Sequence, residues 1–456
     1  MNHFSILFIY FFSLIAPVKT SIDYSSVPQE IVAASEGFQT AETTANTIAT
    51  ASQSVSPALG SFFFVVKIGT DALLILRYLN VKYADFVYVM FENLEIEPLT
   101  PNIFLEWLQG DDFNQDDFVI QRGIFEYQQT SALYLDIFGD KISAMLCWAI
   151  VWIVLFPFKN MITKKGPPFL KKVFNFLWSF LNYTVFLSAM FENFASLVLA
   201  ILLQFETPSL NHRYAVVSFI LTIVSLIGVG CLIRHAFRLT HKVYKEISVG
   251  KVDLSQDAKD TLDRYQVITA EMKNTSQHAF FFFFLVIAES TLIVLILTYL
   301  QIVPLLQFIG VKLVWLIYMK IFYDVKPFAE RETTMIFLII QICFGINLWL
   351  AFPLLFLDDF ETSIRNGLGY ATIAVIITCS ALNIIIALKK SVELAIQYIK
   401  ERRNSKNEQN EDFTLTEDEG LRNESVQHQI VPFNDSKPNS ARKKRVSKNL
   451  EMASLN

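Results

Sequence analysis

Long apolar runs separated by short polar stretches dominate the pattern along most of this chain. Seven runs are long enough to cross a bilayer, because about 20 residues of helix at about 1.5 Å per residue span its hydrocarbon core. The predicted spans are residues 142–158, 173–205, 214–233, 279–300, 302–323, 335–357 and 368–388. The pattern therefore predicts an all-α, polytopic transmembrane helix bundle with about seven spans.

Two further apolar segments precede these spans. Residues 57–78 are interrupted by Lys67, Asp71 and Arg77, and we interpret them as re-entrant, interfacial or packed against the bundle. A true first span with the N-terminus inside is the alternative. Residues 4–16 have the length of a signal-peptide core, so a signal peptide is expected over residues 1–20. No Lys or Arg precedes that core, which leaves an uncleaved anchor open.

The loops differ strongly in charge, and this difference predicts their side of the membrane. Residues 159–172 hold five Lys and no acid, and Lys and Arg are also frequent directly after residues 233 and 388. Residues 79–138 hold eleven acids and only two basic residues, Lys82 and Arg122. Short loops rich in Lys and Arg stay in the cytosol. We therefore expect residues 79–138 and the N-terminus to be extracytosolic, and residues 234–278 and 389–456 to be cytosolic. The sequence does not decide between the plasma membrane and an endomembrane.

The domain organisation follows from these segments. Residues 21–56 form a short extracytosolic stretch rich in Ser, Ala and Thr, and residues 57–138 combine the doubtful apolar segment with an acidic extracytosolic loop. Residues 139–390 form the transmembrane bundle. Residues 391–456 are polar and poor in apolar residues, so we expect a disordered cytosolic tail.

One amphipathic helix is expected in the second cytosolic loop, over residues 255–276. Ser255 can cap its start, and apolar residues then recur at intervals of three and four: Ala258, Leu262, Tyr265, Ile268 and Met272. We expect this helix to pack on the inner ends of the spans. Binding of cytosolic partners through this helix or through the tail is the alternative.

Composition excludes several classes of protein. Of 456 residues, 53% are hydrophobic and 18% are charged, which a soluble enzyme does not show. A net charge of −5 argues against binding of nucleic acid. The four Cys all lie in apolar runs, and no spacing of a metal site or catalytic motif occurs. We therefore expect no enzyme, no catalytic residue, no metal and no cofactor. The lipid bilayer is the expected partner, and a homo-oligomer is left open.

Polar residues inside the spans are the candidate functional residues, because an ionisable group in hydrocarbon costs at least a few kcal/mol. Glu289 and Lys312 lie at similar depth in adjacent spans, so we expect them to pair, either to hold the hairpin together or as part of a cation or proton pathway. Glu192 and Asn193 lie in the long span. In the tail, Thr416 and Ser447 have the flanking charges of kinase sites.

Several short motifs are similar to a known family. Residues 76–83 (LRYLNVKY), 100–102 (TPN), Gly139 and 190–194 (MFENF) resemble the multipass region of TRP-like and polycystin-like membrane proteins of protists. The resemblance implies a channel-like module that conducts or senses ions. The outer loop before the last span has only about ten residues, too few for a pore helix and selectivity filter of the usual tetrameric arrangement. A seven-span receptor-like protein and a membrane scaffold or lipid-handling protein are the alternatives.

Overall fold

The computed structural model describes most of the predicted bundle and parts of the preceding segment. The described residues are 73–94, 102–108, 115–167, 169–171, 174, 190–191, 193–208, 210–248, 277–356 and 362–386, with short pieces at 27–29, 31, 33, 255, 258, 272–273, 389–390, 392–393, 396 and 400. The chain divides into two compact units, residues 1–391 and 392–456. All of the helices below belong to the first unit.

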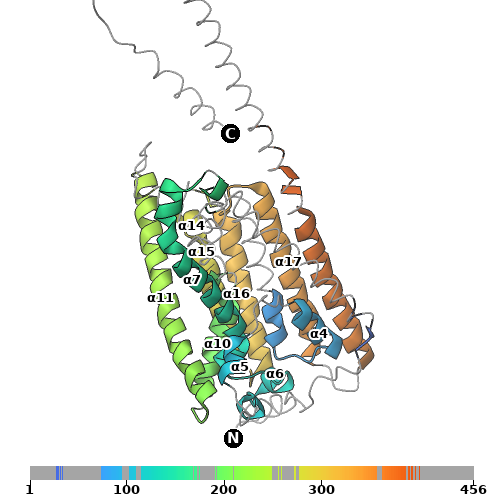
Figure 1. Cartoon of the computed structure of the whole chain (residues 1–456). Coiled ribbons are helices and arrows are strands. Elements are labelled where there is room, and N and C mark those ends of the chain that lie inside the picture. The colour runs from blue at the N-terminus through green and yellow to red at the C-terminus, as the bar shows by residue number, and fades with distance from the viewer. Residues whose placement is uncertain are drawn as a thin grey trace, which may run out of the picture. The chain divides into compact units, whose positions relative to one another are not determined.

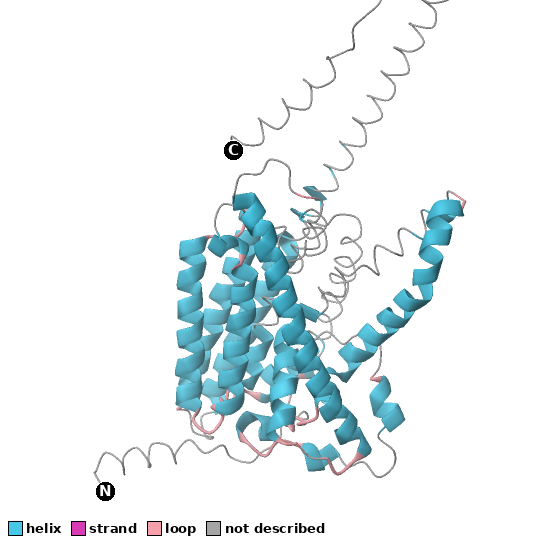
Figure 2. Ribbon diagram, turned by 90° about the vertical axis from the view of Figure 1, so that its left-hand side faces the viewer, coloured by secondary structure: helices cyan, strands magenta, loops and turns pink. Residues whose placement is uncertain are grey.

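Helices account for all of the regular structure in the described part of the chain (Figure 2). In chain order they are η2 (Ile75–Tyr78), α4 (Asp85–Leu94), α5 (Ile103–Leu108), η3 (Gln115–Phe118), α6 (Gly123–Tyr127), α7 (Tyr134–Lys165), α10 (Phe194–Glu206), α11 (Arg213–Ser248), α14 (Gln277–Phe280), α15 (Phe282–Tyr299), α16 (Pro304–Val325), α17 (Arg331–Leu354) and the helix Thr362–Ile386. The predicted all-α, polytopic bundle is confirmed.

Six of these helices are long and apolar enough to cross a membrane: those within α7, α11, α15, α16, α17 and the helix Thr362–Ile386. The chain is therefore a multi-pass membrane protein. The predicted span 173–205 is described mainly from residue 190 onward, where it contains α10. Its first half lies outside the described residues, so the count of seven spans stays a prediction.

Two spanning helices extend well beyond their apolar runs. α7 begins at Tyr134, before the predicted start at 142, and the Asp136 carboxylate in its first turn accepts hydrogen bonds from Ser131 Oγ (2.6 Å) and Tyr214 OH (2.7 Å). α11 continues to Ser248 past the predicted end at 233. Its extension buries residues at intervals of four and three, Ala236, Thr240 and Val243, so a narrow apolar stripe continues the helix among basic residues.

The segment 79–138 differs from the expected loop, because much of it is folded. We call its described part, together with residues 73–78, the cap. Six consecutive residues of α4, from Phe86 to Phe91, are buried, and they belong to the same apolar cluster as side chains of α15, α16 and α17. Net acidity indicates the side of the membrane but does not prevent folding. Residues 73–78 join the same cluster, whereas residues 57–72 lie outside the described part.

The bundle has two distinct ends (Figure 1). α5 and α6 lie at one end, here named the cap end, and α14 lies at the other, the α14 end. Arg213 Nε at the start of α11 donates to the Leu108 carbonyl (2.8 Å) at the cap end. Near α14, the backbone N–H of Lys273 donates to the Pro327 carbonyl (2.8 Å). Segments predicted to be outside thus share one end, and segments predicted to be inside share the other.

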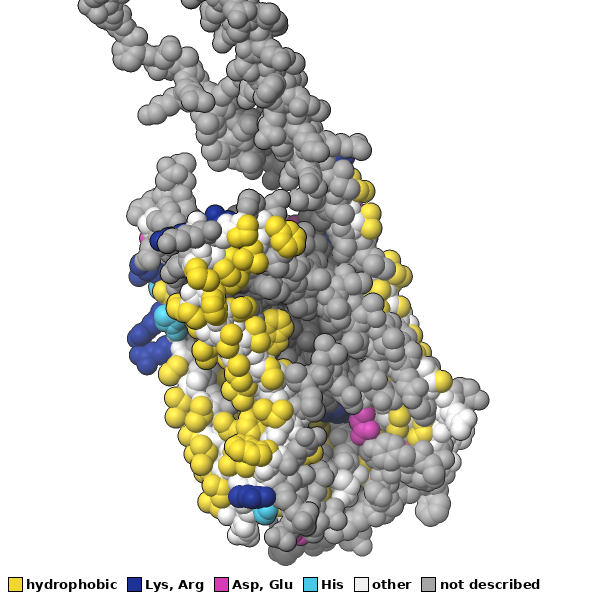
Figure 3. All heavy atoms as spheres, viewed as in Figure 1, with side chains coloured by type: hydrophobic (Ala, Val, Ile, Leu, Met, Phe, Trp, Pro, Cys, Tyr) yellow, Lys and Arg dark blue, Asp and Glu magenta, His cyan; other side chains and the backbone are white. Residues whose placement is uncertain are grey.

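Surface chemistry follows the same division. On the face in Figure 3, hydrophobic side chains run along most of the height of the described surface, and most of the visible Lys and Arg side chains lie toward the α14 end. The exposed apolar residues include Trp148, Ile153 and Phe156 of α7 and Val224 and Ile227 of α11. Large exposed apolar surface of this extent on long helices is typical of contact with lipid.

Candidate functional site

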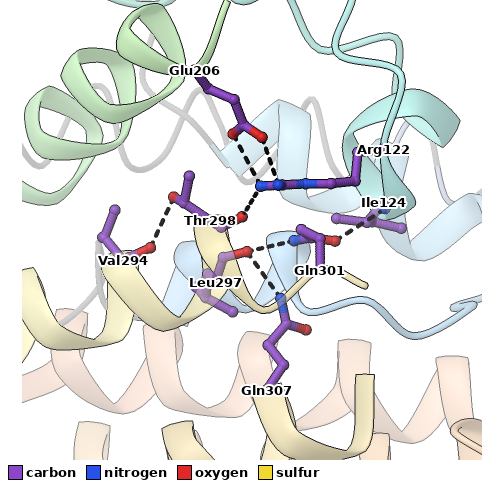
Figure 4. A network of polar contacts seen from close by, with 8 residues as sticks. All are labelled: Arg122, Ile124, Glu206, Val294, Leu297, Thr298, Gln301 and Gln307. Atoms are coloured by element: carbon purple, nitrogen blue, oxygen red, sulfur yellow. Dashed lines mark hydrogen bonds and ion pairs between the residues drawn. The ribbon is translucent and has the colours of Figure 1, made fainter. Parts of the chain in front are cut away.

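A buried polar network fixes the cap to the turn between α15 and α16 (Figure 4). Gln301 lies in this turn, and its Nε2 donates to the carbonyls of Tyr78 (2.9 Å) and Leu297 (2.6 Å). Its Oε1 accepts the backbone N–H of Ile124 (3.2 Å). Because buried backbone groups need partners, this one side chain satisfies groups from the cap and from the helix hairpin together.

Gln307 and Asn80 complete the network. Gln307 Oε1 accepts the backbone N–H of Asn80 (2.7 Å), and its Nε2 donates to the Leu297 carbonyl (2.9 Å). Asn80 Nδ2 donates to the Gln301 carbonyl (2.5 Å). Gly123 lies against this network with φ of +56°, and a Cβ there would approach Gln301 Oε1 to 2.6 Å. The site therefore requires glycine for both conformation and space.

Arg122 connects the cap to two helices of the bundle. Its guanidinium pairs with the Glu206 carboxylate at the end of α10 (2.6 Å) and donates to the Thr298 carbonyl in α15. Figure 4 shows the side chain extended between these two partners. A planar guanidinium suits this role because it presents several donors in fixed directions.

Tyr88 holds the cap together from within. Its hydroxyl donates to the Val81 carbonyl (2.8 Å) and accepts the backbone N–H of Tyr83 (3.3 Å). Burial raises the pKa of the Tyr88 hydroxyl well above its ordinary value, so the group stays neutral and able to donate.

A second group of polar residues lies inside the membrane-spanning part. The Glu289 side chain of α15 is only 8% exposed and lies near Tyr318 of α16. The Tyr318 hydroxyl, Trp315 Nε1, Gln341 Oε1 and both amide atoms of Asn347 are buried without a hydrogen-bond partner among the described residues. Each unpaired buried polar atom costs about 1–3 kcal/mol. The presence of several such atoms on α16 and α17 therefore indicates a functional site.

The predicted Glu289–Lys312 ion pair is not formed within the described part of the chain. Lys312 Nζ instead lies 3.2 Å from the ring centroid of Trp349 in α17. Glu289 lies near Tyr318, and Tyr318 is six residues from Lys312 on α16, which is about 9 Å along the axis and about 120° around it. The two residues do lie on adjacent helices, as predicted. Glu289 of α15 lies near Tyr318, however, whereas Lys312 of α16 contacts Trp349.

The other predicted site residues are distributed as follows. Asn193 directly precedes α10, and its carbonyl accepts the backbone N–H of Leu197 (2.9 Å). Glu192, Thr416 and Ser447 lie outside the described residues. Of the predicted cytosolic helix 255–276, only four residues are described; among them, Ser255 Oγ accepts the backbone N–H of Ala258 (3.3 Å), as a capping residue does.

Sequence reasoning did not identify Gln301, Gln307, Arg122 or Tyr318 as site residues. A weak signal existed for Arg122, which is one of two basic residues among eleven acids in the segment 79–138. Gln301 lies in the predicted hairpin turn and Gln307 follows it, but a glutamine near a turn is too common to indicate a network. In the described chain, no group of three or more His, Cys, Asp or Glu is placed to hold a metal ion.

Comparison with known proteins adds no family assignment. The chain matches no protein-family model, and neither a curated protein nor a solved structure matches it. The fold itself defines the class, a multi-pass helical membrane protein.

Proposed function

We propose that the protein is a TRP-like or polycystin-like membrane protein that conducts or senses ions. The observation that carries this proposal is the Glu289 carboxyl, which is buried in a membrane-spanning helix. The motifs at residues 76–83 and 190–194 support the same family. Intramembrane carboxyl groups commonly belong to ion or proton pathways, because their burial is too costly to persist without a role.

The surroundings of Glu289 supply the chemistry that a cation or a proton needs. The Tyr318 hydroxyl lies near the carboxyl and has no hydrogen-bond partner among the described residues. Elsewhere in the membrane-spanning part, Gln341 and Asn347 of α17 carry further buried oxygen atoms without partners in the described chain. Oxygen atoms of carboxyl, hydroxyl and amide groups replace water around a cation, and the same groups hold water molecules that relay protons.

The test is the current through planar bilayers that contain only the purified full-length protein. We expect cation current from the wild type and a fall of about tenfold or more for Glu289→Gln, since tenfold corresponds to only about 1.4 kcal/mol and an intramembrane charge contributes more. Glu289→Asp keeps the carboxyl group and should retain more current than Glu289→Gln.

The matched control is Glu332→Gln, because Glu332 is in the first turn of α17 and pairs with Lys389 (3.8 Å) near the bundle end. It should conduct like the wild type. Elution profile and circular dichroism of each variant establish that it is folded. Wild-type protein that is folded and gives no current above the protein-free membrane contradicts conduction. Nucleotide exchange on a partner in its place would favour the receptor-like alternative.

We also propose that the cap end is extracytosolic and that the α14 end and the tail are cytosolic. The charge difference between the segments at the two ends supports this orientation. A tag inserted near Asp116 should be labelled on intact cells, whereas a tag after Asn456 should be labelled only after permeabilisation. Labelling in the opposite pattern would reverse the orientation.

A further inference from the structure

Lys312 lies on the outer surface of the bundle and not in its core. Ile309 and Leu316, one turn before and one turn after it on α16, are each about half exposed. On the neighbouring helix α17, Trp349 is 59% exposed and Ile346 is also exposed. Residues three and four apart share one face of a helix, so Lys312 lies on a face that lipid would contact.

The direction of the Lys312 side chain brings its charge toward the cap end. Helical side chains lean toward the N-terminus of their own helix, and α16 begins at the cap end with Pro304. In agreement, Lys312 Nζ lies 5.8 Å from the ring centroid of Phe308, one turn nearer that end. Trp349 is five residues from the last residue of α17, about 7.5 Å along the axis. Trp is enriched near the ends of spanning helices, where acyl chains meet headgroups.

The ammonium group of Lys312 has no acidic partner within the described residues, where its contacts are the rings of Phe308 and Trp349. The acids on the described spanning helices α7, α16 and α17 lie near helix ends: Asp136, Asp140, Asp324 and Glu332. The carboxyl of Glu289 is buried. Of these acids, Asp136 and Asp140 lie at the cap end of α7, and the Asp136 carboxylate already accepts hydrogen bonds from Ser131 and Tyr214. An anionic lipid in the leaflet at the cap end would supply the negative charge that Lys312 lacks within the described residues.

We infer that the exposed face of α16 and α17 around Lys312 and Trp349, at the cap end, binds an anionic phospholipid of the adjoining leaflet. The phosphate oxygens accept hydrogen bonds from Lys312 Nζ. The segments of the acyl chains next to the headgroup lie against Trp349, Ile309 and Ile346. A Lys near the membrane surface attracts anionic lipid by about 1 kcal/mol, which corresponds to about a fivefold preference over a zwitterionic lipid. This inference does not depend on whether the protein conducts ions.

The test uses the fluorescence of Trp349 in the full-length protein reconstituted into phosphatidylcholine vesicles. Phosphatidylglycerol or phosphatidylcholine carrying bromine atoms on the upper acyl chain is added as the quencher. The contribution of Trp349 is the difference between each protein and the same protein with Trp349→Phe. In the wild type, half-quenching should require about fivefold less brominated phosphatidylglycerol than brominated phosphatidylcholine. Soluble glycerol phosphate should not change that ratio, because it carries no acyl chain.

Three variants make the result specific. Lys312→Met should bring the ratio of the two lipids to about one, whereas Lys312→Arg should keep it. Lys320→Met removes the same charge from α16 about 12 Å farther from the cap end and should also keep it. The inference is overturned if the wild type shows no preference or if Lys312→Met retains it. It is equally overturned if neither lipid quenches Trp349 and the protein elutes as an oligomer, since a second copy would then cover this face.

Discussion

Replacing Gln301 with leucine is expected to lower the free energy of unfolding by about 2–6 kcal/mol. The change leaves the carbonyl of Tyr78 and the backbone N–H of Ile124 buried without their present partner, and each such group costs about 1–3 kcal/mol. Gly123 packs closely against the same side chain, so the branched leucine also has little room to shift. We expect the cap to separate from the bundle before the spanning helices unfold.

Thermal unfolding of the detergent-solubilised protein measures this effect, and limited proteolysis reports on release of the cap. Gln277→Leu is the matched control, because Gln277 begins α14 and its side chain is exposed. It should change the melting temperature little. Equal melting temperatures for Gln301→Leu and Gln277→Leu would show that the network contributes no net stability.

The second large effect is expected at Gly345, where even one methyl group meets an aromatic ring. A Cβ at this position of α17 would collide with Cζ2 of Trp315 and lie 2.5 Å from its Cη2. Overpacking of this kind costs about 1–3 kcal/mol, because the ring must leave its position between α16 and α17. Gly345→Ala should therefore destabilise the bundle, even though alanine favours helix more than glycine does.

Gly228→Ala provides the comparison in the middle of another spanning helix. A Cβ at Gly228 of α11 would have no atom within 4 Å. The same substitution should there be neutral or stabilising by up to about 1 kcal/mol. The two variants are compared by thermal unfolding in one detergent. Stabilisation by both would contradict the close contact between Trp315 and Gly345.

Six of the seven predicted spans, in their order along the chain, contain helices long and apolar enough to cross a membrane, so these could be predicted from hydropathy. Hydropathy and charge are summed over many residues, so a single misinterpreted position does not change the predicted span. The early start of α7 was missed because Asp136 makes its first turn polar. Its carboxylate is held there by Ser131 and by Tyr214, which is distant in sequence. The continuation of α11 rests on a stripe too narrow to raise the average hydropathy.

The error at Glu289 and Lys312 has a different physical origin. Sequence position along a hairpin gives the depth of a side chain, but its direction around the helix depends on which helices pack on each side. α17 offers the ring of Trp349 to Lys312, and no pattern within residues 279–323 reveals this. The cap network was beyond prediction for the same reason, since Gln301 acts on residues more than 170 positions earlier in the chain.

The hydrogen bond from Asn80 to the Gln301 carbonyl also limits how early the cap can reach its final structure during biosynthesis. Its two ends are separated by 221 residues, so the ribosome adds all of these before the bond can form. At about 5–20 residues per second, this takes about 10–45 seconds. During that interval the apolar side chains of α4 lack the helices α15, α16 and α17 that later bury them. Until the second half of the bundle has been inserted, the apolar side chains of the nascent cap are therefore either exposed or covered by other molecules.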